Sequence, residues 1–366
     1  MASVLAAPDE ELDAIRERVA SGDVSAASAR LAELLAADLP RARRAFETDE
    51  ALALLRSSPH ADAIRARIAA VETAWRAALP ESVPAVMFAT RPHRVRGGLY
   101  VPSTRRFLPV GSPTRGTVAA LVVPRVERVL VLTQHGVGDY AGHPNISAAM
   151  YPLFGERGSI ASAGPQECNQ CAFVALPDRM RVRYGIEALA RDWSEVAEGR
   201  EGTPAPSGEA VEDAYVFVRR AAFRRDPFYV EGHTDRDGAR RGGPVAGWRV
   251  VGNRVERAGA PSLVLGRGHA AHVAHNIVPS PDASSVVVVS NRTYPACSHV
   301  VDRVEVATAA TRRLASGSGL AAALFHSDGA LFLQRGTATY RFAPDDLEHG
   351  DPLPEGVGLV APLQCD

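Results

Sequence analysis

Apolar residues near the start of the chain recur at the spacing of amphipathic helices. Leu12, Ile15 and Val19 fall at i, i+3 and i+7. Pro40 then stands where one helix can end and the next can begin. This pattern predicts an α-helical segment over residues 1–82.

The last helix of this segment is expected at about residues 61–79. Ile64, Ile68, Val71 and Trp75 are spaced along it so that they share one face. An apolar stripe of this kind needs a surface to pack against, so we expect it to be the docking face of the segment.

Two stretches within the segment have the layout of helix pairs. Asp9 to Pro40 spans 32 residues and closes on a proline, and the shorter stretch from Arg44 to His60 follows it. This layout resembles a tetratricopeptide repeat with a degenerate final unit, although the Trp, Gly and Tyr landmarks of the first helix are missing. A plain helical bundle is the alternative.

From Val83 onward the pattern changes to short runs rich in β-formers, separated by Gly, Pro, Asp and Asn. These runs predict a mainly β domain over residues 83–366, able to fold without the helices. Two segments, 135–164 and 186–210, read as loops that interrupt it, the second with a short helical start around Trp193. The clearest runs are residues 117–123, 128–133, 172–176, 214–218, 285–290 and 330–333.

A turn motif recurs within the β region. Ser280-Pro281-Asp282 leads into a valine-rich run, and a related turn around Asp328 lies one repeat later. Together with Gly268-His269 upstream and the run of residues 301–314, this resembles a blade of a WD40-type or TolB-type β-propeller. The repeat length implies a β-propeller of about five or six blades, and a β-sandwich is the alternative. We expect both aspartates to accept hydrogen bonds from turn amides.

Composition narrows the chemistry that this chain can perform. The 366 residues are 46% hydrophobic and carry a formal net charge of −1, which is typical of a globular protein in the cytoplasm. No apolar run is long enough to span a membrane. All 41 basic residues are arginine, which excludes Walker-type NTPases, lysine Schiff-base enzymes and pyridoxal-phosphate enzymes.

Histidines and aspartates in the loops provide candidates for catalysis. If loops converge on one face of a propeller, distant residues can share one metal ion. The candidates for such a catalytic site are His135, Asp139, His143, His233 and Asp235. A metal-dependent hydrolase is therefore the alternative function.

Other catalytic signatures do not fit. The loop after residues 128–133 contains G-x-G-x-x-A, yet no βαβ pattern follows, so we expect no dinucleotide cofactor. The chain also lacks the G-x-S-x-G elbow of α/β-hydrolases. We therefore expect no cofactor, with zinc as the one exception to test.

The cysteines provide the candidates for that zinc site. Cys168 and Cys171 form a C-x-x-C pair, and Cys297 and His299 can supply the other two ligands of a tetrahedral site. The alternative is that these cysteines are buried free thiols. Four unevenly spaced cysteines are too few for a disulfide scaffold in a chain of this length.

Taken together, the sequence predicts a scaffold that binds another protein and does not catalyse a reaction. Repeated units present large surfaces, and no catalytic set stands out. Aromatic residues make up only 6% of the chain, which disfavours binding of single-stranded nucleic acid by stacking. We expect a protein partner, no nucleic acid and no membrane.

Overall fold

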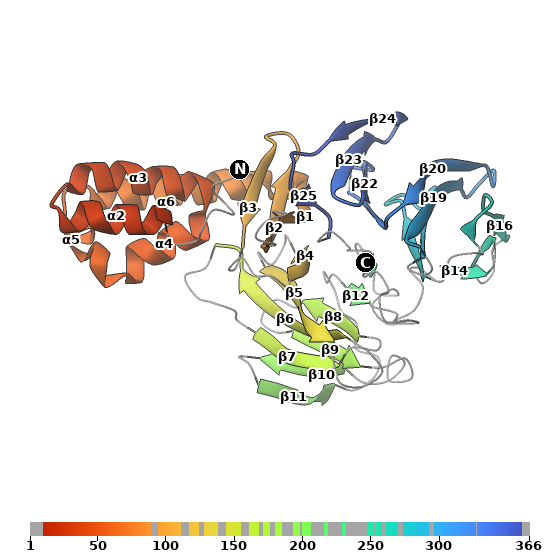
Figure 1. The fold of residues 1–366 in the computed structure, drawn as a ribbon, viewed down its shortest axis with the longest axis horizontal. Coiled ribbons are helices and arrows are strands. Elements are labelled where there is room, and N and C mark those ends of the chain that lie inside the picture. The colour runs from red at the N-terminus through yellow and green to blue at the C-terminus, as the bar shows by residue number, and fades with distance from the viewer. Residues whose placement is uncertain are drawn as a thin grey trace.

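A computed structural model shows a helical segment followed by a series of antiparallel sheets (Figure 1). Between residues 111 and 252, side chains are described at positions 129, 131, 133, 149 and 151–154. The backbone is described for residues 10–88, 94–110, 117–123, 128–137, 144–154, 161–167, 171–175, 180–184, 193–197, 200–205, 216–218, 229–231, 248–251, 253–257, 261–269, 274–292, 296–326 and 328–360.

The helices form where the apolar spacing predicts them. Leu12, Ile15 and Val19 are buried on one face of the first described helix. The expected stripe on the last long helix, from Ile64 to Trp75, is buried as well. The helical elements are α2 (Glu10–Ala20), α3 (Val24–Ala37), α4 (Leu39–Thr48), η1 (Glu50–Leu52), α5 (Ala53–Arg56), α6 (Ala61–Ala78) and η2 (Leu79–Glu81).

Aspartates begin several of these helices. Asp23 Oδ1 accepts a hydrogen bond from the Ala26 amide at 3.1 Å, and Asp38 Oδ1 accepts one from the Arg41 amide at 3.3 Å. Pro40 lies in the first turn of α4, where no amide hydrogen is needed. These caps satisfy amide groups that have no partner within the helix.

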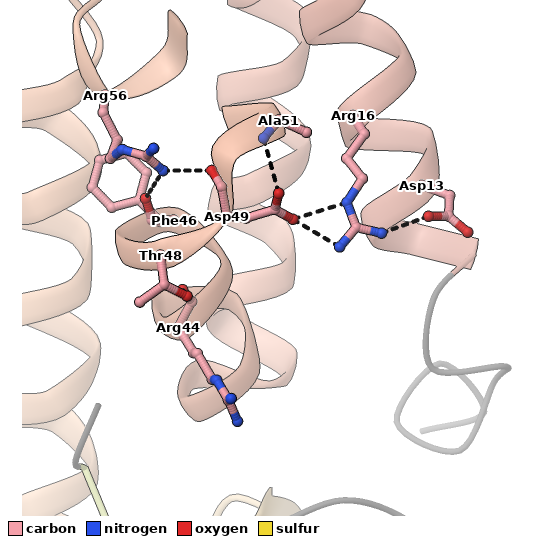
Figure 2. Close-up of polar contacts among 8 residues, drawn as sticks. All are labelled: Asp13, Arg16, Arg44, Phe46, Thr48, Asp49, Ala51 and Arg56. Carbon is pink, nitrogen blue, oxygen red and sulfur yellow. Dashed lines mark hydrogen bonds and ion pairs between the residues drawn. The ribbon is translucent and has the colours of Figure 1, made fainter. Parts of the chain in front are cut away.

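A polar network holds the end of α4 against α2 (Figure 2). Asp49 Oδ1 accepts from the Ala51 amide at 3.0 Å, and its Oδ2 accepts from Arg16 Nε at 2.8 Å. Arg56 Nη1 donates to the carbonyl oxygens of Phe46 and Asp49 at 3.0 and 2.7 Å. The short 3-10 turn between α4 and α5 is therefore fixed by Arg16 of α2 and Arg56 of α5.

The described strands form six antiparallel sheets that follow one another along the chain (Figure 1). The first sheet contains β1 (Val83–Phe88), β2 (Val95–Val101), β3 (Arg106–Pro109) and β25 (Val357–Gly358). The second contains β4 (Thr117–Val123), β5 (Arg128–Val137), β6 (Pro144–Pro152) and β7 (Ala161–Glu167). The third contains β8 (Cys171–Ala175), β9 (Met180–Tyr184), β10 (Trp193–Ala197), β11 (Arg200–Ala205), β12 (Val216–Val218) and β13 (Tyr229–Glu231).

The last three sheets are built in the same way. The fourth contains β14 (Trp248–Val251), β15 (Arg254–Arg257) and β16 (Leu263–Val264). The fifth contains β17 (Ala274–Pro279), β18 (Ser285–Arg292), β19 (Ser298–Glu305) and β20 (Thr311–Ser318). The sixth contains β21 (Ala321–Phe325), β22 (Leu331–Arg335), β23 (Ala338–Ala343) and β24 (Asp346–Pro352). In the second, fourth, fifth and sixth sheets, the strands pair in sequence order.

Successive sheets share apolar cores. Val255 and Leu263 of the fourth sheet pack with Val288 of the fifth, and Val289 of the fifth packs with Leu331 of the sixth. Another core joins the sixth sheet to the first through residues that include Phe332 and Met87. Each shared core buries one face of two neighbouring sheets, which explains why β18 and β22 are buried along almost their whole length.

The last described strand completes the first sheet, so the two ends of the β region meet. Met87 of β1 pairs with Val357 of β25 in antiparallel register. Gln334 in β22 holds the residues after β25: its Oε1 accepts from the amides of Leu359 and Val360 at 2.7 and 3.0 Å. Its Nε2 donates to the Val360 carbonyl at 3.0 Å.

Asn291 makes a similar bridge one sheet earlier. It is the penultimate residue of β18, as Gln334 is of β22. Asn291 Nδ2 donates to the Ala321 carbonyl and its Oδ1 accepts from the Ala321 amide, both at 2.9 Å. The buried Asn291 side chain therefore joins the fifth sheet to the sixth. The buried Gln334 side chain joins the sixth sheet to the residues after β25, the last strand of the first sheet.

The helical segment packs directly on the first two sheets. One core contains the stripe of α6 together with Leu99 of β2 and Val129 of β5. Arg43 of α4 donates to the Phe154 carbonyl at 2.9 Å, and the Arg76 guanidinium lies 4.8 Å from the centre of the Phe154 ring. The helices and the sheets are therefore parts of one packed unit.

The structure confirms the helical start, the mainly β remainder and the six strand runs, but it corrects the two expected loops. β5, β6 and β7 place strands within 135–164, and β10 and β11 form a hairpin within 186–210, where a helical start around Trp193 was expected. Gly and Pro within several of these strands locally favour a loop, whereas pairing with neighbouring strands decides the conformation.

The turns at Asp282 and Asp328 have the predicted hydrogen bonds. Asp282 Oδ1 accepts from the Ser284 amide at 3.1 Å, and Asp328 Oδ1 accepts from the Ala330 amide at 2.8 Å. Hydrogen bonds from the Ser280 hydroxyl, and then from the amide and hydroxyl of Ser284, lower the pKa of Asp282 from 3.8 to about 2. Among the described helices, none combines the length and apolar character that crossing a bilayer requires.

Candidate functional site

Ser290, His269 and Asp302 form a Ser-His-Asp arrangement between the fourth and fifth sheets. His269 Nδ1 lies 2.6 Å from Ser290 Oγ, and its Nε2 lies 3.1 Å from Asp302 Oδ2. Gly268 and His269 follow β16, while Ser290 belongs to β18 and Asp302 to β19. The distances match those of nucleophilic hydrolases, so access to the serine decides what the arrangement can do.

Burial shows that this arrangement is structural. Ser290, His269 and Asp302 each have a relative exposure of 0%. A nucleophilic serine must meet its substrate, and a substrate cannot reach a hydroxyl that no water can touch. The Ser-His-Asp set therefore joins the segment after β16 to the fifth sheet and is not a site of hydrolysis.

Asp302 is the centre of this buried network. Its Oδ2 accepts from the Gly266 amide at 2.7 Å, and its Oδ1 accepts from Arg313 Nε. Burial raises the pKa of the Asp302 carboxyl, but the contacts with His269 and Arg313 outweigh burial and lower the pKa overall. A Cβ at Gly266 would lie 2.6 Å from both Asp302 Oδ2 and Arg313 Nη2, so the network requires glycine there.

The predicted hydrolase residues fall largely outside the described part of the chain. His135 lies in β5, where only the backbone is described. Asp139, His143, His233 and Asp235 lie outside the described residues. Their convergence on one metal ion stays a prediction.

Cys297 differs from the sequence-based expectation of reduced thiols or a metal ligand, because its sulfur takes part in a disulfide. A disulfide sulfur is not the thiolate that zinc binds, so a zinc site at Cys297 requires the reduced chain. Cys171 lies in β8 with only its backbone described, and Cys168 lies outside the described residues. The four-ligand zinc site stays a prediction.

His299, the fourth predicted zinc ligand, is buried in β19. Its Nδ1 lies 3.2 Å from the Gly319 carbonyl oxygen, and burial lowers the pKa of the imidazole. Within the part of the chain that the structure describes, no three His, Cys, Asp or Glu side chains group closely enough to hold a metal ion.

A surface groove lies where the helical segment meets the first sheet. We call it the α6 groove, and its volume is about 190 Å³. Its lining is mostly apolar and includes the buried residues Val71 and Trp75 of α6. The residues that line it are Ala36, Arg67, Ala70, Val71, Ala74, Trp75, Ala78, Thr104 and Arg106.

Two arginines flank the α6 groove. The Arg106 guanidinium lies 5.4 Å from the centre of the Trp75 ring, and its Nη2 donates to the Ala36 carbonyl at 2.5 Å. Arg67 lies two turns before Trp75 on α6 and is exposed. Neither arginine has a carboxylate partner among the described residues. The groove therefore combines an apolar floor with two positive charges at its rim.

The β2–β3 turn, which ends just before Arg106, is strained. Arg105 has a φ of 52°, in the left-handed region that glycine and asparagine adopt most readily. The turn is closed by a hydrogen bond from the Arg105 amide to the Pro102 carbonyl at 3.2 Å. Strain of this kind is often kept where the surface has a function.

The sequence pattern identified the α6 side of this groove but not the opposite side. The apolar stripe of α6 includes Val71 and Trp75, and its spacing was sufficient to identify it. Thr104 comes from the β2–β3 turn and Arg106 from the start of β3, and no local pattern places these residues beside α6.

Comparisons with known proteins assign no family to this chain. No family model matches it, and no curated protein matches it. A candidate 6-phosphogluconolactonase from Bacteroides fragilis has a similar structure with a TM-score of 0.39 and 9% identity, over 76% of this chain and 98% of that one.

Two further solved structures have lower scores. An acylaminoacyl peptidase in complex with a chloromethyl ketone gives a TM-score of 0.31 at 8% identity, over 75% of this chain and 43% of that one. Hsv2 from Kluyveromyces marxianus gives 0.29 at 8% identity, over 73% and 74% of the two chains. Similarity at this level does not transfer a function.

Proposed function

We propose that this protein is a non-catalytic interaction scaffold built on a β-propeller of six blades. Three features of the described sheets support the propeller. The sheets follow one another along the chain, neighbouring sheets share apolar cores, and β25 completes the first sheet. Closing the first sheet with the last strand joins the two ends of the β region, as a closed ring of sheets requires.

The observation that carries the scaffold proposal is the α6 groove and its fixed position. Asp38, between α3 and α4, forms a buried ion pair with Arg96 of β2, and the helices share a core with the first two sheets. A groove formed by two parts of a chain keeps its shape only if those parts do not move apart. The packing of helices on sheets therefore presents a preformed surface to a partner.

The size of the groove favours a protein partner over a small molecule. Pockets for drug-sized ligands usually enclose about 300–1,000 Å³, whereas the α6 groove encloses about 190 Å³. A volume of this size suits one or two side chains of a larger partner.

A groove-filling variant tests the proposal. Ala70 is exposed and lines the groove, so Ala70→Trp fills the space without disturbing the core. Ala66→Trp is the matched control, since Ala66 is exposed on the same helix and does not line the groove. Each chain is tagged, cross-linked in cells of its source and purified, and the proteins that co-purify are quantified by mass spectrometry.

We expect a protein in near-stoichiometric amount with the unaltered chain and with Ala66→Trp, and a reduction of at least tenfold with Ala70→Trp. Equal recovery with both variants would show that the groove is not the binding surface. Absence of any stoichiometric protein, or turnover of a hydrolase substrate that depends on added metal, would overturn the scaffold function.

A further inference from the structure

We infer that the α6 groove binds an acidic peptide segment, with an aliphatic side chain on the groove floor and carboxylates paired with Arg67 and Arg106. This inference rests on the proposed scaffold function and specifies its partner. The charges of the groove carry it: two arginines lie on the rim, and no acidic residue is among the lining residues.

The floor of the groove is suited to an aliphatic side chain. Ala70, Ala74 and Ala78 follow one another at intervals of about one helical turn on α6. Their small side chains leave open the space of the groove, and Val71 and Trp75 also line it. A leucine-type side chain buried there removes apolar surface from water on both molecules. A strongly hydrated phosphate would gain nothing from this apolar floor.

Arg106 is held in place before any partner arrives. Its guanidinium is fixed over the Trp75 ring and by the bond to the Ala36 carbonyl. A guanidinium has five donors in a planar fork, so donors remain for a carboxylate after one bond to a carbonyl. Because the side chain is already ordered, pairing with a partner carboxylate loses less conformational entropy.

Arg67 supplies the second charge at a defined separation. Arg67 and Trp75 are eight positions apart on α6, which corresponds to about 12 Å along the helix. An extended peptide covers this distance with about four residues. A segment with acidic residues on both sides of one or two leucines therefore matches the groove.

Peptide binding to the full chain tests the inference directly. The probe is a fluorescein-labelled, end-blocked Asp-Glu-Leu-Leu-Glu-Asp peptide, measured by fluorescence anisotropy. Two comparison peptides replace the acidic residues by Asn and Gln, or the leucines by Ser. A single-stranded oligonucleotide of matching charge is added as a competitor.

We expect saturable binding of the acidic peptide that weakens as salt increases, because exposed ion pairs are screened. The amide and serine peptides are each expected to bind at least tenfold more weakly. Arg67→Glu should weaken binding at least tenfold and should fold normally, because Arg67 is exposed and has no ion-pair partner among the described residues. Ala70→Trp should abolish binding, and Ala66→Trp should leave it unchanged.

Several results would overturn the inference. They are equal binding of the amide peptide, full binding by Ala70→Trp, displacement by the oligonucleotide at equal concentration, or no binding of any peptide. The scaffold function is judged separately: if Ala70→Trp still releases the co-purifying protein while the acidic peptide fails to bind, the groove binds a partner of different chemistry. If the acidic peptide fails to bind and Ala70→Trp also releases no co-purifying protein, the proposed scaffold function of the groove is rejected as well.

Discussion

Arg96 in β2 and Asp38 between α3 and α4 form a buried, two-point ion pair, although 58 positions separate them in the chain. Arg96 Nη1 donates to Asp38 Oδ2, and Nη2 donates to Oδ1 at 3.0 Å. Asp38 also ends α3 and begins α4. One carboxylate therefore fixes both a helix junction and the docking of the helices on the first sheet.

The first prediction separates these two roles of Asp38. Asp38→Ala removes the carboxylate that pairs with the buried Arg96 guanidinium, so we expect the free energy of unfolding to fall by about 3 to 5 kcal/mol. Asp23→Ala is the matched control: Asp23 caps α3 in the same way but is exposed, and its loss should cost about 1 kcal/mol. Chemical denaturation measures both, and equal losses would mean that the ion pair contributes nothing beyond the cap.

The second prediction concerns a shortened chain of residues 83–366. The sequence predicts that this part folds alone, whereas the shared core predicts that it loses stability when its apolar face is exposed. We expect thermal unfolding at a lower temperature than in the full chain. Arg96→Met in the shortened chain should recover part of the loss, because it removes a charge left without Asp38. An unchanged melting temperature in the shortened chain would show that the helices do not stabilise the sheets.

The third prediction concerns Asp282 and pH. Asp282→Ala removes the turn hydrogen bonds and should cost about 1 kcal/mol at pH 7. Because folding lowers the pKa from 3.8 to about 2, the ionised carboxylate stabilises the fold above about pH 4, and this stabilisation is lost as the pH falls towards 2. The denaturation midpoints of the variant and the unaltered chain should therefore converge at low pH.

Asp351 provides the control for that experiment. It is exposed in β24 and accepts no turn hydrogen bond among the described residues. The denaturation midpoint of Asp351→Ala should differ from that of the unaltered chain by a similar small amount at pH 7 and at low pH. A gap for Asp282→Ala that stays constant from pH 7 to about pH 2.5 would contradict the role of the ionised carboxylate.

The fourth prediction tests how the last strand is held. Gln334→Met keeps the length of the side chain but leaves the buried amides of Leu359 and Val360 without their acceptor. We expect a loss of about 2 to 4 kcal/mol and faster hydrogen exchange at those two amides. Asn291→Leu should instead expose the Ala321 amide to exchange. If the two variants gave the same exchange pattern, the amide side chains would not act on separate sheet junctions.

The fifth prediction concerns a strained turn in the fifth sheet. Ala309 has a φ of 57°, and its amide donates to the Glu305 carbonyl at 2.9 Å. Ala309→Gly should raise the free energy of unfolding by about 0.5 to 1 kcal/mol, because glycine adopts this conformation without strain. Ala307→Gly, in the same exposed turn but without a positive φ, should lower it by a similar amount. A decrease for both variants would show that the strain at Ala309 is negligible.

The sequence by itself determined the local structure of this protein. Helical spacing placed the stripe from Ile64 to Trp75, and the side chains of Asp282 and Asp328 specified their turns, because both features depend on residues only a few positions apart. The same reasoning failed at Trp193, where pairing with neighbouring strands overrides a local helical pattern.

Only the tertiary structure decided which of the chemically suggestive residues can act. Ser290, His269 and Asp302 come together, yet burial closes them to any substrate, and sequence spacing carries no information on burial. The α6 groove exists because packing brings Arg106 at the start of β3 beside Trp75 of α6. Contacts between distant segments depend on how the whole apolar surface is buried, so no short stretch of sequence specifies them.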